Sequence, residues 1–381
     1  MTEDPIVVAG AARTPMGGFQ GELAGVSAAE LGGVAIRAAL ERAGARPSDV
    51  EELLMGCVLP AGQGQAPARQ AGFAAGLGEE VPATTLNKMC GSGMKTVMQA
   101  HDAILAGSAE VVVAGGMESM SGAPYLLPKM RGGARLGHAE VKDHMFLDGL
   151  EDAYDTGRLM GTFAEDAAQA FQFTREAQDA YAVRSLTEAL RAQTDGSFDA
   201  EVAAVTVKGR KGEAVVSTDQ QPRTADPAKV PQLKPAFREG GTVTAANSSS
   251  ISDGAAALVL TRLSVAEARG MQVRAKVLGH ASHAALPKDF PTAPGPAMRR
   301  LMARLGWEVA DVDLWEINEA FAVVPMCAEA ELGLPRERLN VNGGACALGH
   351  PIGASGARIL VTLLHALQQR DEETGIAAIC H

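Results

Sequence analysis

Short runs of consecutive apolar residues alternate along this chain with segments in which apolar positions recur every three or four residues. Three of the runs predict buried strands: residues 6–10, 53–59 and 110–116. Two periodic segments predict helices, one over residues 28–43 that ends at Gly44 and one between Cys90 and Gly107. Strands and helices in this alternation predict an α/β layered fold.

The second half of the chain repeats this order of elements. The segment that ends at Gly44 resembles the one that ends at Gly306. Cys90 follows the first of these glycines by 46 positions, and His350 follows the second by 44. Cys90 and His350 are each followed by an amphipathic helix and then by a short apolar run. Chance similarity between alanine-rich segments is the alternative, but agreement in order and spacing at several points favours a duplicated domain.

The region between the halves, residues 119–240, differs from both. It is polar and rich in loops, with a helical stretch at residues 174–194 and a proline-punctuated segment at residues 221–235. Long loops in a compact protein are usually functional. We therefore expect an excursion from the first domain that acts as a lid or ligand-binding cap.

Composition narrows the classes of function. The 381 residues are 46% hydrophobic but only 4% aromatic, so the cores must be built mainly from aliphatic side chains. The net charge of −11 argues against nucleic-acid and anionic-membrane partners. No apolar run approaches the roughly 18 residues that cross a bilayer, and no signal peptide is expected at the start of the chain.

Cysteine usage points to a reducing compartment. The five cysteines are odd in number and form no CxxC pair. A disulfide framework or a zinc site is therefore not expected, and no metal ligands are assigned. The same usage favours a cytoplasmic location.

Cys90 lies in a glycine-rich elbow, residues 87–93, where a strand should end and a helix begin. Gly91 and Gly93 allow a tight turn and a close approach of the backbone to a ligand. The N–H groups and dipole of the helix start are expected to favour the thiolate of Cys90 over the thiol. A buried structural cysteine is the alternative, and the flanking glycines argue against it.

A second elbow, residues 342–351, carries His350 next to Pro351, and a proline at this position predicts a helix entry. The other seven histidines lie in settings without a comparable glycine framework. Cys380 supplies a second thiol, which suits a separate proton transfer. A thiol at a helix start with a histidine to take its proton predicts acyl transfer through a thioester-linked enzyme.

Asn318 and Glu319 follow a strand-like run at residues 312–315. Asn318 fits a residue that holds a water or donates to a developing oxyanion, and it equally fits a helix N-cap. Glu319 fits a buried acceptor that orients a neighbour, or a first-turn charge that complements a helix dipole. The sequence leaves these alternatives open.

Several stretches resemble the thiolase family and occur in that family's order: residues 86–93, 115–121, 241–247, 318–322 and 340–356. A match this long and multiple is far more specific than a single short motif. The resemblance implies an α/β thiolase fold, with two duplicated αβαβα-layered domains and an inserted loop domain. The implied boundaries are residues 1–118 with 241–265 for the N-terminal domain, 119–240 for the loop domain and 266–381 for the C-terminal domain.

The resemblance also implies roles for the four catalytic candidates. Cys90 would be the acylated nucleophile, and His350 would activate first Cys90 and later the coenzyme A thiol. Cys380 would add or remove the α-proton of acetyl-CoA. Asn318 would hold the water of an oxyanion site that it shares with His350.

Ligand contacts are implied at further positions. Arg223 and Lys229 fall where the family's loop domain meets the phosphates and adenine of coenzyme A, although ordinary solvated charge is an equal alternative. Ser249 resembles the serine that contacts the pantetheine arm. The implied acyl-pocket residues are Met160, Phe290 and Phe321. The bulky Phe290 resembles the type that accepts short acyl chains.

Coenzyme A and acetyl-CoA enter this picture as substrates, and no tightly bound cofactor is expected. The resemblance brings in one ion, a K⁺ site formed near four residues: Tyr154, Ala245, Ala246 and Cys346. It also suggests a homotetramer built as a dimer of dimers.

The resemblance implies an acyltransferase that condenses two acetyl-CoA molecules reversibly to acetoacetyl-CoA and coenzyme A, with ping-pong kinetics through acetyl-Cys90. A 3-ketoacyl-CoA thiolase of fatty-acid oxidation, acting on longer chains, is the enzymatic alternative. A non-catalytic acyl-CoA-binding relative is an alternative of another class, suggested by one departure. The family continues beyond its late cysteine with a glycine-rich loop and a final strand. The sequence as given stops at His381, before both: either the tail is omitted from it, which we favour, or this form lacks full activity. Loss of the final strand would leave a sheet edge open.

Overall fold

The structure, a computed structural model, describes residues 4–209 and 212–380. Its strands are β1 (Ile6–Arg13), β2 (Gly17–Gly18), β3 (Glu52–Gly56), β4 (Ala83–Leu86), β5 (Val111–Ser119), β6 (Tyr125–Leu126), β7 (Lys142–Asp143), β8 (Val205–Gly209), β9 (Gly212–Val216), β10 (Ser252–Arg262), β11 (Ala275–Lys276), β12 (Leu314–Ile317) and β13 (Gly375–Ala378). Its helices are α1 (Ala28–Ala43), α2 (Pro67–Ala75), α3 (Ser92–Ala106), α4 (Met160–Ala170), α5 (Arg175–Thr194), α6 (Gln220–Thr224), α7 (Leu263–Arg269), α8 (Pro294–Leu305), α9 (Val323–Leu332), α10 (Ala345–Leu348) and α11 (Ile352–Arg370).

The first half is built on a seven-stranded sheet in the order β11-β1-β10-β5-β3-β4, with β2 paired to β10. β5, β3 and β4 run parallel, whereas β10 is antiparallel to both of its long neighbours, β1 and β5. β10 follows the long inserted region in the chain. The polypeptide therefore returns to the centre of its first sheet after that excursion.

Alternate residues of β1 enter different cores. Val7 and Ala9 pack in the core that contains residues of α1 and α2, whereas Ile6 and Val8 pack in the core that contains residues of α3 and α11. Successive side chains of a strand point to opposite faces, and here helices cover both faces. This is why the strand appears in the sequence as an unbroken apolar run.

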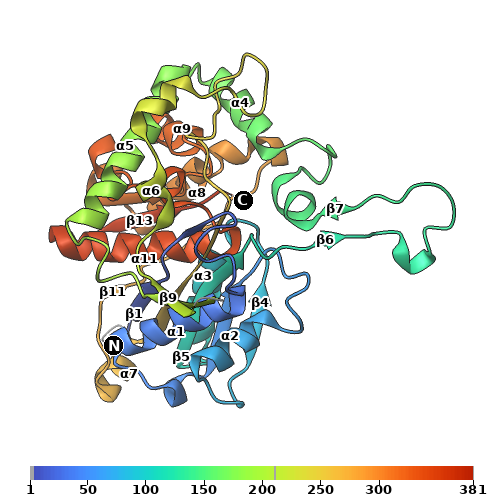
Figure 1. Ribbon diagram of the computed structural model, residues 1–381. Helices are drawn as coiled ribbons and strands as arrows, with labels where there is room; N and C mark the ends of the chain where they lie inside the picture. The colour runs from blue at the N-terminus through green and yellow to red at the C-terminus, as the bar shows by residue number, and fades with distance from the viewer. Residues whose placement is uncertain (1–3, 210–211, 381) are drawn as a thin grey trace.

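Helix α11 links the two halves. It packs against β5 and β10 of the first sheet and also against β12 and β13, which pair in parallel in the second half. α3 lies beside α11, so the two helices form a layer between the sheets (Figure 1). α8 and α9 supply side chains to the core on the other face of β12 and β13. The predicted α/β layered fold is confirmed.

Several element boundaries could be predicted, because the residues that cap these elements lie next to them in the sequence. α1 occupies residues 28–43, as predicted, and Ser27 and Glu30 form a capping box at its start. It ends at Gly44, which has a left-handed φ of 69°. The strand predicted at residues 53–59 is shorter than expected and ends at Gly56, because the backbone N–H groups beyond it bond to a side chain described below.

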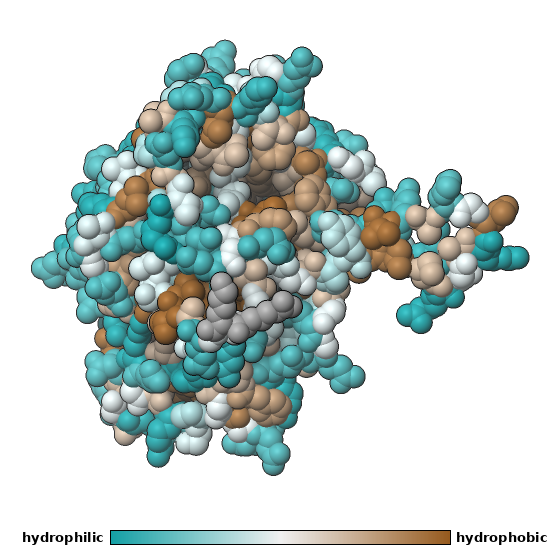
Figure 2. Space-filling view, in the orientation of Figure 1, coloured by the Kyte–Doolittle hydropathy of each residue, from teal (hydrophilic) through white to brown (hydrophobic). Residues whose placement is uncertain are grey.

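The inserted region, residues 119–240, carries an arm formed by the β6–β7 pair. The arm projects from the body in Figure 1, and Figure 2 shows apolar residues where it leaves the body. Its exposed apolar side chains include Tyr125, Leu127 and Leu136. Within the described residues, no helix has the length and hydrophobicity needed to cross a membrane.

Candidate active site

Two glycines, one on each helix, bring the starts of α3 and α11 into close contact. A Cβ atom added at Gly93 would lie 2.8 Å from the backbone nitrogen of Ala357, and one added at Gly356 would lie 2.5 Å from the backbone nitrogen of Met94. Real Cβ atoms do not approach backbone this closely, so only glycine allows the crossing. Cys90 precedes α3 and His350 precedes α11. The crossing therefore sets these two side chains against each other.

The thiol and the imidazole are in direct contact. Cys90 Sγ lies 3.2 Å from His350 Nε2, and His350 Nδ1 lies 2.5 Å from Ser355 Oγ. The Ser355 hydroxyl donates to the carbonyl of Pro351 at 3.0 Å. Because that hydroxyl proton is already used, Ser355 Oγ accepts the Nδ1–H of His350. This tautomer leaves Nε2 free to take the proton of Cys90.

The cysteine elbow is held in an unusual backbone conformation. Met89 has a positive φ of 47°, which is uncommon for a residue other than glycine. The Ser92 side chain stabilises the turn, since it accepts from the Lys88 N–H at 2.8 Å and donates to the Met89 carbonyl at 2.6 Å. The turn directs the Cys90 side chain toward His350 rather than into the core of the first sheet.

Burial keeps the resting pair neutral. It raises the pKa of the Cys90 thiol to about 12, with a smaller contribution from the Glu118 carboxylate, against the lowering effect of a backbone N–H. It also lowers the pKa of His350 to about 3, with help from the Arg358 charge. The expectation that the helix start would favour the thiolate is therefore wrong for the resting protein, because desolvation outweighs it. His350 is poised as a neutral base.

Cys380 lies two residues after β13 and is buried. Burial raises its pKa well above the ordinary value, and the nearby Cys90 sulfur raises it further. The Asn318 N–H donates to the carbonyl of Ala378 at 3.0 Å and so fixes the end of β13 against β12. The influence of the Cys90 sulfur on this pKa places the Cys380 thiol near Cys90.

Asn318 is fully buried in the loop between β12 and α9. Since α9 begins at Val323 with Ala322 as its N-cap residue, the N-cap alternative for Asn318 is wrong. Neither its amide oxygen nor its amide nitrogen has a hydrogen-bond partner within residues 4–209 and 212–380. A buried amide without a protein partner fits a side chain that holds a water or a ligand oxygen.

Glu319 is a buried acceptor and not a first-turn charge. Its carboxylate accepts hydrogen bonds from the Ser185 hydroxyl at 2.7 Å, the Asn340 amide at 2.8 Å and the Cys346 N–H at 3.0 Å. These donors come from α5, from α10 and from the loop that precedes α10. Glu319 therefore joins the inserted region to the second elbow. Of its two predicted roles, this is the buried acceptor that orients a neighbour.

Glu118 is a site residue that the sequence reasoning did not single out. Its buried carboxylate accepts the N–H groups of Val58 at 2.8 Å, Leu59 at 3.1 Å and Gly353 at 2.8 Å. These bonds end β3 at Gly56 and fix the first turn of α11 next to His350. The available signal was a charged residue within the apolar run of β5, a position where an unpartnered charge would be costly.

The three acyl-pocket candidates come together in one core. Phe290 and Phe321 are buried with ring centroids 6.2 Å apart, and Met160 packs against the same cluster, which also contains Cys380. Phe163 and Phe237 extend this aromatic group, at 6.4 Å from Phe290 and 5.8 Å from Phe321 respectively. The Cys380 thiol therefore lies beside an apolar wall that suits a short acyl chain.

The coenzyme A candidates lie farther out. Arg223 on α6 forms an ion pair with Glu22 at 2.7 Å and is 42% exposed, and Lys229 is 74% exposed. Ser249 donates to the carbonyl of Ala320 at 2.9 Å and so borders the Asn318 loop. Ser249 is thus part of the site's frame, whereas the two cations are on the surface and neither bonds to the catalytic residues among the described residues.

The residues suggested for K⁺ do not fit a closed ion site. Tyr154 is 85% exposed, and the Cys346 thiol is directed at the carbonyl of Glu319, 3.8 Å away. No catalytic step is derived through K⁺.

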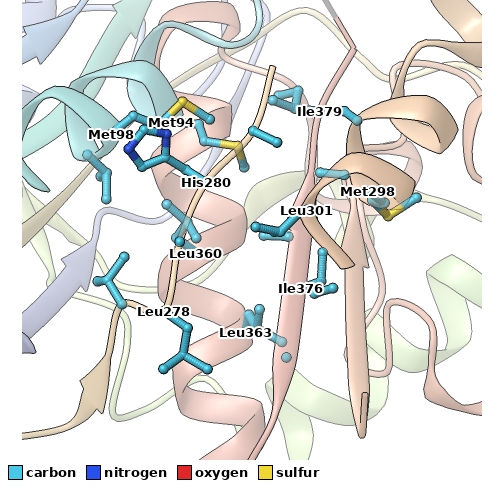
Figure 3. A pocket seen from close by; sticks show the side chains of 18 of the residues that line it. Met94, Met98, Leu278, His280, Met298, Leu301, Leu360, Leu363, Ile376 and Ile379 are labelled. Atoms are coloured by element: carbon cyan, nitrogen blue, oxygen red, sulfur yellow. The ribbon is translucent and has the colours of Figure 1, made fainter. Parts of the chain in front are cut away.

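A cavity of about 230 Å³ lies between β13 and the segment at residues 275–283 (Figure 3). Its wall is apolar and includes Met94 of α3, Leu360 of α11 and Met298 of α8. Gly91 lines one end, but none of Cys90, His350 and Cys380 does. The cavity is therefore distinct from the catalytic group, and it faces the edge of β13 that does not pair with β12.

Two family models match this chain, and they divide it into the same two halves as the fold. Profiles described as "Thiolase, N-terminal domain" and "Thiolase, C-terminal domain" match residues 6–264 and 271–381. The chain is 49% identical over 379 residues to the acetyl-CoA acetyltransferase of Cupriavidus necator, covering 98% of this chain and 96% of that protein. It is 49% identical over 380 residues to acetyl-CoA acetyltransferase 2 of Arabidopsis thaliana, covering 99% and 94%. The crystal structure of the Bacillus anthracis acetyl-CoA acetyltransferase superposes with a TM-score of 0.96 at 41% identity, covering 99% of this chain and 95% of that one.

Proposed function

The chain belongs to the thiolase family, and we propose that it is an acetyl-CoA C-acetyltransferase that interconverts acetoacetyl-CoA plus coenzyme A with two molecules of acetyl-CoA. The observation that carries this proposal is the 3.2 Å contact between Cys90 Sγ and His350 Nε2, with Cys380 buried beside it. The acetyltransferases of Cupriavidus necator and Arabidopsis thaliana, similar over nearly the whole chain, support it.

The cleavage direction uses each group in its resting protonation state. His350 Nε2 takes the Cys90 proton, and the thiolate attacks the ketone carbon of acetoacetyl-CoA. The carbon–carbon bond breaks, leaving an acetyl group on Cys90 and the enolate of acetyl-CoA. Cys380, whose pKa is raised by burial, donates its proton to that enolate. The imidazolium of His350 then returns the proton that restores the Cys380 thiol.

The second half-reaction releases the acetyl group. His350 takes the proton of the coenzyme A thiol, and the resulting thiolate attacks the acetyl carbonyl on Cys90. Collapse of the tetrahedral intermediate expels the Cys90 thiolate, which recovers its proton from His350. The unpartnered buried amide of Asn318 supports its proposed role, which is to hold the water of an oxyanion site with His350. One such donor contributes about 2.7–4 kcal/mol to lowering a barrier.

Substrate length and ligand contacts are part of the proposal. The bulky, buried Phe290 and Phe321 near Cys380 favour acetoacetyl-CoA over longer 3-ketoacyl-CoA substrates. Arg223, Lys229 and Ser249 are proposed contacts of coenzyme A. Comparing kcat/KM for acetoacetyl-CoA and a long-chain 3-ketoacyl-CoA tests this. Preference for the long substrate would replace the proposal with a thiolase of fatty-acid oxidation.

Assembly and location complete the proposal. The exposed apolar side chains on the β6–β7 arm support a homotetramer, because a single chain leaves them in water. The five cysteines are all free thiols, which supports a reducing, cytoplasmic location. The domain boundaries implied by the resemblance, with the loop domain at residues 119–240, are part of this proposal.

A further inference from the structure

A second group of metal-ligating side chains lies outside the active site. His101 and Asp102 are adjacent near the end of α3, and His280 lies on the segment that follows β11. One ligand atom from each of the three lies within 4.8 Å of the other two. Figure 3 shows the His280 ring beside Met94 and Met98 of α3. The reaction derived above uses none of the three residues.

The two imidazoles share one carboxylate oxygen. His280 Nε2 lies 2.8 Å from Asp102 Oδ1, and His101 Nδ1 lies 3.4 Å from the same atom. The rings stand nearly perpendicular, with centroids 5.3 Å apart. The side chains of His101 and His280 are only 16% and 26% exposed, whereas Asp102 is 53% exposed. Packing therefore holds the imidazoles, while the carboxylate side stays open to solvent.

The charge at this position suits a cation. In residues 4–209 and 212–380, Asp102 forms ion pairs with the two histidines and with no lysine or arginine. Among the described residues, the carboxylate therefore lacks a permanently charged positive partner.

We infer that His101, Asp102 and His280 form a binding site for a divalent transition-metal ion of the Zn²⁺ type. Two imidazoles and one carboxylate are ligands that Zn²⁺ takes, and the exposed side leaves a fourth position for water. Tetrahedral bonds to Zn²⁺ place ligand atoms about 3.4 Å apart, and the contacts of Asp102 Oδ1 with His280 and His101, at 2.8 Å and 3.4 Å, lie near that spacing.

The metal would fasten a segment that has little other regular structure. Residues 277–286 belong to no helix or strand. The cluster joins this segment to α3, which begins two residues after Cys90. The ion would therefore tie this segment to α3 at a point about ten residues along the chain from the reacting thiol.

Calorimetric titration with ZnCl₂ tests the site. The active-site thiols can themselves bind zinc, so the Cys90→Ser, Cys380→Ser double variant serves as the parent. We expect one equivalent of Zn²⁺ to bind to this parent. His280→Ala should weaken binding at least about tenfold, the minimum seen even for outer-shell partners of a metal. His283→Ala, on the same segment but outside the cluster, is the matched control and should bind like the parent.

A second variant separates a metal ligand from a simple hydrogen bond. His280→Gln can still donate to Asp102 but is a poor zinc ligand. It should therefore retain the melting temperature of the metal-free parent and lose the rise in melting temperature that ZnCl₂ produces in the parent. The inference is overturned if the parent shows no saturable Zn²⁺ binding, or if His280→Ala and His283→Ala bind Zn²⁺ equally.

Discussion

At the scale of single residues, the active site depends on one chain of hydrogen bonds. The Pro351 carbonyl accepts from Ser355, Ser355 accepts from His350 Nδ1, and His350 Nε2 faces Cys90. Burial keeps the thiol and imidazole neutral until substrate arrives. The tautomer of His350, and not a charged neighbour, therefore leaves Nε2 free to act as the base.

Removing the hydroxyl of Ser355 should weaken this arrangement. In Ser355→Ala, His350 Nδ1 loses its acceptor and the reactive tautomer is no longer favoured. We expect kcat/KM for acetoacetyl-CoA to fall about tenfold, in line with the loss of one hydrogen bond. Ser355→Thr keeps the hydroxyl and should recover most of the activity. Equal activity of the parent and a folded Ser355→Ala variant would contradict the assigned tautomer.

The depressed pKa of His350 makes a prediction about acid stability. The native imidazole stays neutral down to about pH 3, whereas an ordinary histidine takes a proton near pH 6.5. The unfolded chain therefore binds one more proton in this window, and the free energy of unfolding falls as the pH falls from 6.5 toward 3. The contribution of one proton to the slope is about 1.4 kcal/mol per pH unit.

Urea unfolding of His350→Asn between pH 4 and 7 measures that contribution. The variant should lose free energy of unfolding less steeply than the parent on acidification. His138→Asn, on the exposed arm, is the control and should follow the parent. Parallel curves for His350→Asn and the parent would show that the native imidazole titrates normally.

At the scale of elements, the active site is made by a helix crossing. α3 and α11 come from the two copies of the repeated pattern, and each carries its reactive residue just before its first turn. The glycines at their contact have no room for a methyl group. The same duplication that the sequence indicates therefore produces the pairing of thiol and imidazole.

Gly93→Ala tests this geometry. The added methyl group must push α11 away, which should lower the free energy of unfolding by about 1–3 kcal/mol. A displacement of about 1 Å between reacting groups costs about 100-fold in rate, so kcat/KM should fall by about that factor. Gly25→Ala, whose Cβ would meet nothing within 4 Å, is the matched control. Normal activity of Gly93→Ala would mean that the crossing does not position Cys90.

The elements that could be predicted are those whose signals are local. The bounds of α1 follow from its periodicity, its capping box and Gly44, and Cys90 and His350 stand out through the glycines around them. Glu118 could not be assigned, because its role depends on backbone N–H groups that are distant in sequence. The sequence could not decide between the two roles of Asn318, because the burial of its amide comes from the whole fold. The thiolate expectation failed for the same reason, since burial of Cys90 comes from the whole site.

At the scale of the whole molecule, the inserted region connects the site to the surface. Glu319 ties α5 of this region to the second elbow, and the β6–β7 arm extends from the same region into solvent (Figure 1). Leu136 on the arm is 97% exposed. Contact between arms of neighbouring subunits is the proposed way in which these apolar side chains are covered.

Replacing Tyr125, Leu136 and Val141 with serine should therefore reduce the assembly. We expect sedimentation to show a change from tetramer to dimer, while Cys90 in the variant still accepts an acetyl group. Val215→Ser, a similarly exposed position on the β8–β9 hairpin, is the control and should leave the assembly unchanged. An unaltered sedimentation coefficient in the arm variant would remove the arm from the interface.

The central claim is that Cys90 carries the acyl group while Cys380 transfers a proton, and intact mass spectrometry after incubation with acetyl-CoA tests it most directly. The parent and Cys380→Ser should each gain one acetyl group, and Cys90→Ala should gain none. In the same samples, Cys380→Ser should form no acetoacetyl-CoA. Acetylation of Cys90→Ala to the level of the parent, or an unmodified parent, would contradict the account.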